Sequence, residues 1–401
     1  MELVTPEDLG FSSQRLSRIS ATIQGYIDQG KIAGTVTLIA RHGKIAHFEA
    51  LGYMDIESGK PMQLDSIHRI ASMTKLVTVV SVMMLYEEGH FLLDDPISQF
   101  IPEFAQTKVF VGETDQGFEV TDLQRPITIR HLLMHMSGLP YGNPSGTPVE
   151  KAFDREQIGR PDELLEHQVR RIAHLPLAHQ PGSAWTYGYS HDVLGRMVEV
   201  ISGMSLDVFF ARRLFEPLGM VDTGFYVPAP SLGRLAEVHA PSVQGRLERL
   251  DRPVLDAPQR IKLSGGGGLV STAADYARLC QMLLNGGHLD GAQVLGRTTI
   301  DLMTANQMSG EDTPFQADIP LPGRPAGWRM ALGVATVVDM AKNGVPLSVG
   351  SYSWMGAWGT VFWIDPTEDL FGVLMVQQGS GSFWGRPMGI FPGLAYQALV
   401  G

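Results

Sequence analysis

The chain has 401 residues and a formal charge of −11, and 44% of its residues are apolar against 18% charged. This composition is typical of a globular protein with a large hydrophobic core, and it excludes a disordered chain. Because the acidic chain contains no run of Lys or Arg, we expect neither nucleic acid nor a membrane as a partner.

The single cysteine, Cys280, excludes an internal disulfide, and its setting in "DYARLCQMLLNGG" predicts a small core residue. The N-terminal "MELVTPEDLGFSS" has no basic start followed by an apolar stretch. The longest apolar runs, of about ten residues, are too short to span a bilayer. We therefore expect a cytoplasmic protein.

The first predicted element is an amphipathic helix in "SSQRLSRISATIQGYIDQG", with apolar residues at positions 16, 19, 23 and 27. A strand, a tight turn and a second strand are predicted in "GTVTLIA", "RHG" and "KIAHFEALGY". An apolar helix follows over residues 70–89, and Gly89 ends it.

From about residue 95 to about residue 325, helical segments alternate with long loops rich in Pro and Gly. Sequence patterns typical of strands return near residue 329. The predicted fold class is therefore α+β, with an antiparallel sheet built from both ends of the chain and flanked by helices. We expect residues 1–95 and 327–401 to form this sheet domain and residues 96–326 a mainly helical domain. An active site is expected between the two.

The helix over residues 70–89, "IASMTKLVTVVSVMMLYEEG", begins with Ser72 and Lys75, three residues apart. Residues at this spacing lie on one face of a helix, so the hydroxyl and the amine can meet. A serine hydroxyl is a weak nucleophile that needs a nearby base, and burial among Leu76, Val77 and Val79 disfavours the charged form of the lysine. Partial positive charge at the helix N-terminus acts in the same direction. The alternative is a serine N-cap beside a lysine that extends into water.

Several segments in order along the chain favour the first interpretation. "SIHRIASMTKLVTVV" resembles the nucleophile motif of serine β-lactamases and penicillin-recognising enzymes. The segments "ITIRHLLMHMSGLP", "PGSAWTYGYSHDVLGRMVEVISGMSLDVFF", "SGGGGLVSTAADYARLCQMLLNGG" and "WMGAWGTVFWIDP" resemble later motifs of the class C β-lactamase and esterase branch. Within that branch, the chain most resembles family VIII carboxylesterases and their acyltransferase relatives. The resemblance implies a β-lactamase/transpeptidase-like fold.

The resemblance also implies a catalytic tyrosine, and two candidates stand two residues apart. The family pattern of Pro-Gly, Trp and Tyr before an Asp-Val-Leu-Gly helix start places Tyr187 on the family tyrosine, with Gly188 as the small residue after it. Tyr189 is not expected to be the catalytic tyrosine. A phenol near Lys75 can pass a proton between Ser72 and the leaving oxygen, and whether Lys75 or Tyr187 is the general base stays open.

The third family motif, Lys-Thr-Gly in penicillin-binding members and usually Trp-Gly-Gly in the esterases, reads Trp354-Met355-Gly356 in this chain. Without a cation there, neutral acyl substrates are favoured over anionic ones, and Trp354 is expected to offer an apolar wall. Met355 departs from the usual small residue and could reshape the acyl or alcohol pocket. By resemblance, the oxyanion hole consists of the backbone N–H groups of Ser72 and Ala357.

The sequence thus predicts a serine hydrolase that cleaves short-chain acyl esters through an acyl-enzyme intermediate, with no metal or cofactor. Ser72, Lys75 and Tyr187 are the expected catalytic residues, and Trp354, Met355, Gly356 and Ala357 the expected substrate-binding residues. His131 and His135, four residues apart, are expected to be structural, because the zinc-protease pattern fails after His131. The loop "GSGSFWGRP" from residue 379 could also line the site.

The alternatives to this function are a β-lactamase or D-amino acid peptidase, an acyltransferase to an alcohol acceptor, and a ligand-binding sensor without turnover. No Gly-x-Ser-x-Gly elbow occurs in the chain, so an α/β-hydrolase triad lacks its usual nucleophile.

Overall fold

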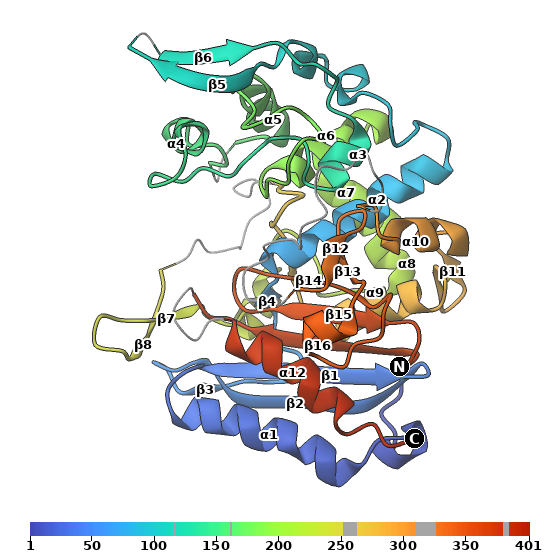
Figure 1. The fold of residues 1–401 in the computed structure, drawn as a ribbon. Coiled ribbons are helices and arrows are strands. Elements are labelled where there is room, and N and C mark those ends of the chain that lie inside the picture. Colours follow the sequence, from blue (N-terminus) through green and yellow to red (C-terminus); the bar gives the residue numbers. More distant parts are fainter. Residues whose placement is uncertain (116, 161–162, 252–262, 309–325, 380–384) are drawn as a thin grey trace.

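The computed structural model describes residues 1–115, 117–160, 163–251, 263–308, 326–379 and 385–401. Its centre is an antiparallel sheet to which both ends of the chain contribute, as the sequence predicts (Figure 1). Within the described residues, this sheet has eight strands. Their order is β12 (Trp328–Met330), β13 (Ala335–Val337), β14 (Tyr352–Met355), β15 (Val361–Asp365), β16 (Leu370–Val376), β1 (Gly34–Arg41), β2 (Lys44–Asp55) and β3 (Lys60–Pro61).

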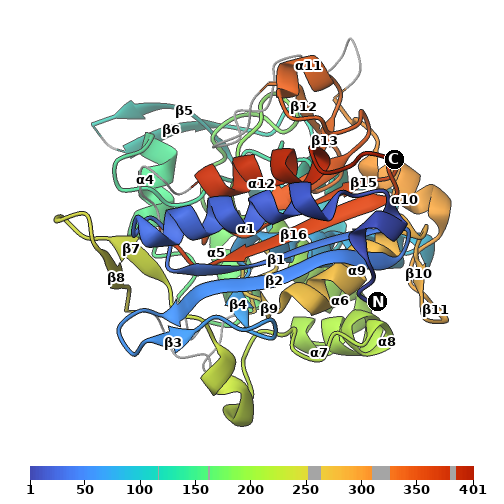
Figure 2. The same cartoon turned by 90° about the horizontal axis from the view of Figure 1, so that it is seen from below.

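The two chain ends meet where β1 pairs with β16, in a register that runs from Thr35 opposite Val376 to Arg41 opposite Leu370. All of β16 and all of β1 except Arg41 is buried, because helices cover both faces of the sheet at this point. Figure 2 shows α1 (Ser13–Asp28) and α12 (Arg386–Tyr396) side by side over one face. The opposite face is covered by α9 (Ala273–Leu284), which contacts β1, β15 and β16.

Helix α2 (Thr74–Glu87) is the buried helix expected after the first strands. Every residue from Thr74 to Leu85 is buried. The helix is apolar all round, and such a helix is stable only inside a protein core. In Figure 1 it lies between the sheet and the helices α3 to α7. This central position brings its N-terminal end close to segments from both halves of the chain.

The other helices are α3 (Ile129–Leu133), α4 (Pro148–Arg155), α5 (Leu165–Ala173), α6 (Ser190–Ser202), α7 (Leu206–Phe210), α8 (Glu216–Leu218), α10 (Arg297–Thr304) and α11 (Met340–Asn343). Short antiparallel pairs join β4 (His68–Arg69) to β9 (Val270–Ser271), β5 (Val109–Thr114) to β6 (Gly117–Thr121), β7 (His239–Pro241) to β8 (Leu247–Arg249), and β10 (His288–Leu289) to β11 (Ala292–Gln293). Over the described ranges, no helix is long and apolar enough to cross a membrane.

Cys280 is fully buried in α9, which confirms its prediction as a core residue. The division into a sheet domain and a mainly helical domain at residues 95 and 327 stays a prediction. Helix α9 comes from the segment assigned to the helical domain, yet it packs against the sheet. The two groups of elements therefore share one continuous core around α2 and α9.

Candidate active site

Ser72 lies in a single 3₁₀ turn, Ala71–Met73, directly before α2. Its neighbour Ala71 has a φ of 44°, in the left-handed region that residues with a Cβ rarely adopt. Non-glycine residues in this region store strain, and such strain clusters at functional sites. The turn presents the partly buried Ser72 hydroxyl at the N-terminal end of the buried helix.

Lys75 occupies the first turn of α2 and has no exposed surface. Its Nζ lies 3.2 Å from Ser72 Oγ, 3.1 Å from the Tyr141 hydroxyl and 2.6 Å from the carbonyl oxygen of Gly266. The alternative of a lysine that extends into water is therefore wrong. The surroundings also differ from the apolar ones expected for the amine, because Nζ points at three oxygen atoms.

Tyr187 approaches Ser72 from the loop that precedes α6. Its hydroxyl donates to Ser72 Oγ at 2.8 Å, and Lys75 Nζ lies 4.7 Å from the centre of its ring. The loop is held by close backbone contacts: the N–H of Thr186 donates to the carbonyl of His135, and a Cβ at Gly188 would lie 2.0 Å from the carbonyl oxygen of Leu139. Tyr187 therefore reaches Ser72 only because residue 188 is a glycine.

The structure thus brings Ser72, Lys75 and Tyr187 together, although Tyr187 is 115 residues from Ser72 along the chain. Tyr189 has a different role. It is buried, and its hydroxyl donates to the carbonyl of Ile158 at 3.0 Å, in the loop after α4.

Tyr141 is a site residue that the sequence reasoning missed. Its hydroxyl accepts a hydrogen bond from Lys75, and its ring packs edge-on against the Tyr187 ring at 5.4 Å. Burial raises the pKa of Tyr141 well above its ordinary value, so the phenol stays neutral. It directly follows the family-like segment that ends at Pro140, but no spacing rule linked it to Lys75.

We expect Tyr141→Phe to lower kcat for ester hydrolysis about two- to tenfold, because the Lys75 amine loses one of its three hydrogen-bond partners and a net hydrogen bond contributes roughly 0.5–1.5 kcal/mol. Tyr141 positions the amine of Lys75, so KM should change little and the pH–rate profile should shift. Tyr189→Phe, which removes a hydroxyl bonded to Ile158, is the matched control. An unchanged kcat and pH profile in Tyr141→Phe would show that Lys75 needs no support from Tyr141.

The glycine turn before α9 provides the third contact of Lys75. The carbonyl of Gly266 accepts from Nζ, and the carbonyl of Gly265 accepts from the Thr78 hydroxyl one turn further along α2. A Cβ at Gly265 would lie 2.5 Å from the carbonyl oxygen of His191, and one at Gly266 would lie 2.6 Å from Asp192 Oδ2. This glycine turn therefore brings backbone carbonyls close to α2.

Two fully buried histidines, His135 and His191, lie behind Tyr187. Their ring centres are 4.7 Å apart, and the His135 ring is 4.6 Å from the Tyr187 ring. No ring nitrogen of either has a hydrogen-bond partner among the described residues. Desolvation lowers the pKa of both imidazoles well below the ordinary value, and smaller contributions come from His191 and Lys75 for His135 and from Lys75 for His191. Both are therefore neutral, and neither contacts Ser72 as a base would.

Helix α3 spans Ile129–Leu133, and His135, just beyond its end, has a φ of 58° in the left-handed region. His131 caps this helix, since its Nδ1 accepts from the N–H of Thr128 at 3.2 Å. The structural role expected for His131 is confirmed.

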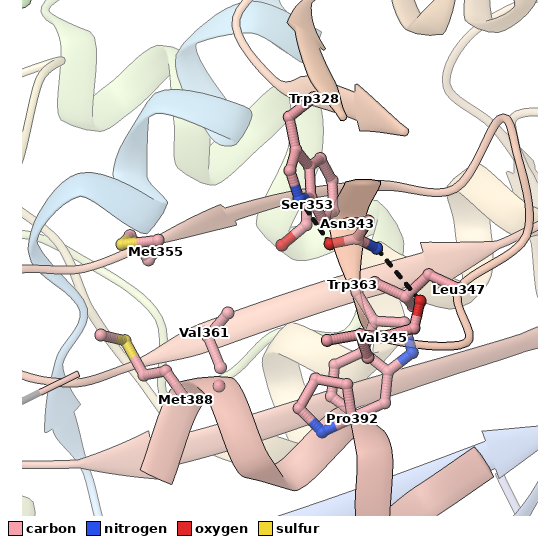
Figure 3. A pocket seen from close by; sticks show the side chains of 11 residues that line it. Trp328, Asn343, Val345, Leu347, Ser353, Met355, Val361, Trp363, Met388 and Pro392 are labelled. Atoms are coloured by element: carbon pink, nitrogen blue, oxygen red, sulfur yellow. Dashed lines mark hydrogen bonds between the residues drawn. The ribbon is translucent and has the colours of Figure 1, made fainter. Parts of the chain in front are cut away.

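The residues of the third motif separate onto different sides of β14. The buried Trp354 faces the Tyr187 ring at 5.9 Å and stacks on the His135 ring at 6.2 Å. Met355 lies on the other face of the strand and lines an apolar pocket (Figure 3). Gly356 packs on the turn before Ser72, since a Cβ there would lie 2.3 Å from the carbonyl oxygen of Ile70. Ala357 is exposed just beyond β14.

In the loop from residue 379, which could line the site, residues 380–384 lie outside the described residues. An oxyanion hole formed by the N–H groups of Ser72 and Ala357 stays a prediction. The contact between Gly356 and Ile70 supports it, because it holds the two backbone segments next to each other.

An antiparallel sheet with such a serine, lysine and tyrosine defines a serine hydrolase of the β-lactamase type. The beta-lactamase family model matches residues 19–386, and the chain belongs to this family. The predicted β-lactamase/transpeptidase-like fold is confirmed, and the protein is an enzyme.

Curated relatives include lovastatin esterase of Penicillium rubens, 32% identical over 90% of this chain and 92% of its own length. Esterase EstB of Burkholderia gladioli is 29% identical over 87% of each chain. Among solved structures, EstCE1, described as a hydrolase with promiscuous acyltransferase activity, matches with a TM-score of 0.79 and 28% identity. The match covers 97% of this chain and 99% of EstCE1. These similarities agree with the resemblance to family VIII esterases.

Proposed function

We propose that the protein is a carboxylesterase that hydrolyses short-chain acyl esters through an acyl-enzyme on Ser72. The observation that carries this proposal is the Ser72 hydroxyl, within hydrogen-bond reach of both Lys75 Nζ and the Tyr187 hydroxyl. A nucleophile and a base at this separation, held by further bonds, are the parts that covalent catalysis needs.

In the proposed reaction, Ser72 Oγ attacks the ester carbonyl carbon and gives its proton to Lys75 or Tyr187. The N–H groups of Ser72 and Ala357 stabilise the oxyanion, at about 2.7–4 kcal/mol for each donor of this kind. The C–O bond to the alcohol then breaks, and the alcohol leaves with the transferred proton. Water attacks the acyl-enzyme in the same way and releases the acid and free Ser72.

The contacts of Lys75 suit this proton transfer. A carbonyl oxygen can only accept, so one N–H of Lys75 stays committed to Gly266 in either protonation state. The charged amine donates to all three oxygen atoms around it. The neutral amine donates to two of them and offers its lone pair to the Ser72 hydroxyl.

Trp354 supports neutral esters over β-lactams as substrates. An indole ring packed beside Tyr187 offers no cation to a substrate carboxylate, unlike the lysine at this position in penicillin-binding relatives. The description of EstCE1 favours one further activity, acyl transfer to an alcohol in place of water. Both activities share the acyl-enzyme and differ only in the second nucleophile.

The test compares p-nitrophenyl butyrate with nitrocefin, with and without added butanol. We expect ester hydrolysis, with kcat/KM for nitrocefin lower by at least about 10²-fold because its carboxylate lacks a charged partner. Detection of butyl butyrate by mass spectrometry would show that the enzyme also transfers the acyl group to butanol. Faster turnover of nitrocefin than of the ester would overturn the assignment in favour of a β-lactamase.

A further inference from the structure

An apolar pocket lies on the face of β14 that is turned away from Trp354 and Tyr187. It is bounded by β14 and β15, by α12, and by the loop after α11 (Figure 3). The strand register explains which side chains meet there: Met355 pairs with Val361 and Ser353 with Trp363, so all four share one face. The remaining lining residues are Trp328, Asn343, Val345, Leu347, Met388, Gly389 and Pro392.

The polar side chains of this lining are largely engaged with protein atoms. The indole N–H of Trp328 donates to Asn343 Oδ1 at 2.9 Å, and the Asn343 amide donates to the carbonyl of Val345 at 3.3 Å. The Ser353 hydroxyl donates to the carbonyl of Phe362. The pocket therefore presents a mainly hydrocarbon surface, which is suited to an apolar ligand.

One end of the pocket is formed by Met355, which stands between Trp354 and Gly356 of the proposed active site in the chain. Figure 3 shows Met355 and Met388 at one end, away from Trp328, Asn343 and Leu347. Met355 directly precedes Gly356, which contacts the carbonyl of Ile70, two residues before Ser72. Met355 is also partly exposed.

We infer that this pocket receives an alkyl chain of the ester substrate, with Met355 at its entrance. The inference rests on the proposed esterase function. The cavity volume of about 50 Å³ is a third of the roughly 150 Å³ that holds benzene, so it suits a short chain segment of about two carbon atoms. The alcohol half of the ester is the expected occupant: Trp354 lies beside Tyr187, and a chain on the leaving oxygen would pass the neighbouring Met355 to reach the opposite face of β14.

Gly389 allows a clean test. A Cβ there would meet no heavy atom within 4 Å, so Gly389→Leu adds bulk to the pocket wall without a clash at Cβ. Gly393, one turn further along α12, is equally free of contacts at Cβ and does not line the pocket, so Gly393→Leu is the matched control. Leu also favours a helix more than Gly does, so both variants should fold.

The substrates are two isomeric esters: butyl acetate carries the longer chain in the alcohol half, and ethyl butyrate carries it in the acyl half. Ethyl acetate is the reference. We expect Gly389→Leu to lower the ratio of kcat/KM for butyl acetate to that for ethyl acetate about tenfold. Gly389→Ala should show a smaller decrease in the same direction, and Gly393→Leu no change in the ratio.

If Gly389→Leu lowered the ratio of kcat/KM to that for ethyl acetate only for ethyl butyrate, the pocket would still bind an alkyl chain, but that of the acyl half. Unchanged ratios for both isomers in Gly389→Leu, with a wild-type enzyme that hydrolyses both esters, would overturn the pocket assignment alone. A wild-type protein that hydrolyses none of the three esters would instead contradict the proposed function.

Discussion

Ser72→Ala should lower kcat for p-nitrophenyl butyrate by roughly 10⁴- to 10⁶-fold, because removal of a catalytic nucleophile removes the covalent route altogether. A fluorophosphonate should modify the wild-type protein once, and peptide mapping should place the adduct on Ser72. The Ala variant should not be modified. Intact-protein mass spectrometry measures both outcomes directly.

Ser81→Ala is the matched control for this prediction. Ser81 is a fully buried serine in the same helix, and its hydroxyl donates to the carbonyl of Val77 at 2.9 Å. We expect this variant to keep its activity and its fluorophosphonate adduct. Labelling of a different serine, or full turnover in Ser72→Ala, would show that Ser72 is not the nucleophile.

Lys75→Met should cost roughly 10²- to 10⁴-fold in kcat, the range for loss of a general acid–base group. Methionine keeps most of the volume of the buried side chain, so the variant tests the amine rather than the packing. The exposed Lys44 at the start of β2 provides the control, and Lys44→Met should retain wild-type kinetics. Thermal melts of both variants show whether a loss of activity reflects unfolding.

Comparison of leaving groups then separates the roles of Lys75 and Tyr187. p-Nitrophenolate leaves without a proton, whereas ethanol must receive one. If Tyr187 gives this proton, Tyr187→Phe should affect ethyl butyrate at least about tenfold more than p-nitrophenyl butyrate. An equal loss on both esters would instead identify Tyr187 as the base that takes the proton of Ser72.

The local parts of the structure could be predicted because they depend on short-range geometry. Residues 72 and 75 lie one helical turn apart in any helix, so their contact required only that the helix begin near Ser72. The strands β1 and β2 and the helix α1 were visible as alternating and helical apolar patterns, and Ser12 at the start of α1 accepts from the N–H of Arg15.

The contacts of Tyr141 and the histidine pair could not be predicted in this way. Tyr141 meets Lys75 across 66 residues, and Gly266 meets it across 191 residues. Both contacts depend on loops whose paths are set by close backbone approaches, such as that of Gly265 to the carbonyl of His191. No periodicity in the sequence encodes such an approach.

By itself, the sequence determined the pairing of a serine with a lysine at the start of a buried helix, and it pointed to an antiparallel sheet built from both chain ends. These features follow from periodicity and from the cost of exposing apolar residues to water. The family pattern already favoured Tyr187 over Tyr189, and only the tertiary structure decided that Tyr141 and Gly266 contact Lys75 and that Met355 faces away from Trp354 into a pocket. The reason is that loop paths and strand faces are set by packing against distant segments, which neighbouring residues in the chain do not specify.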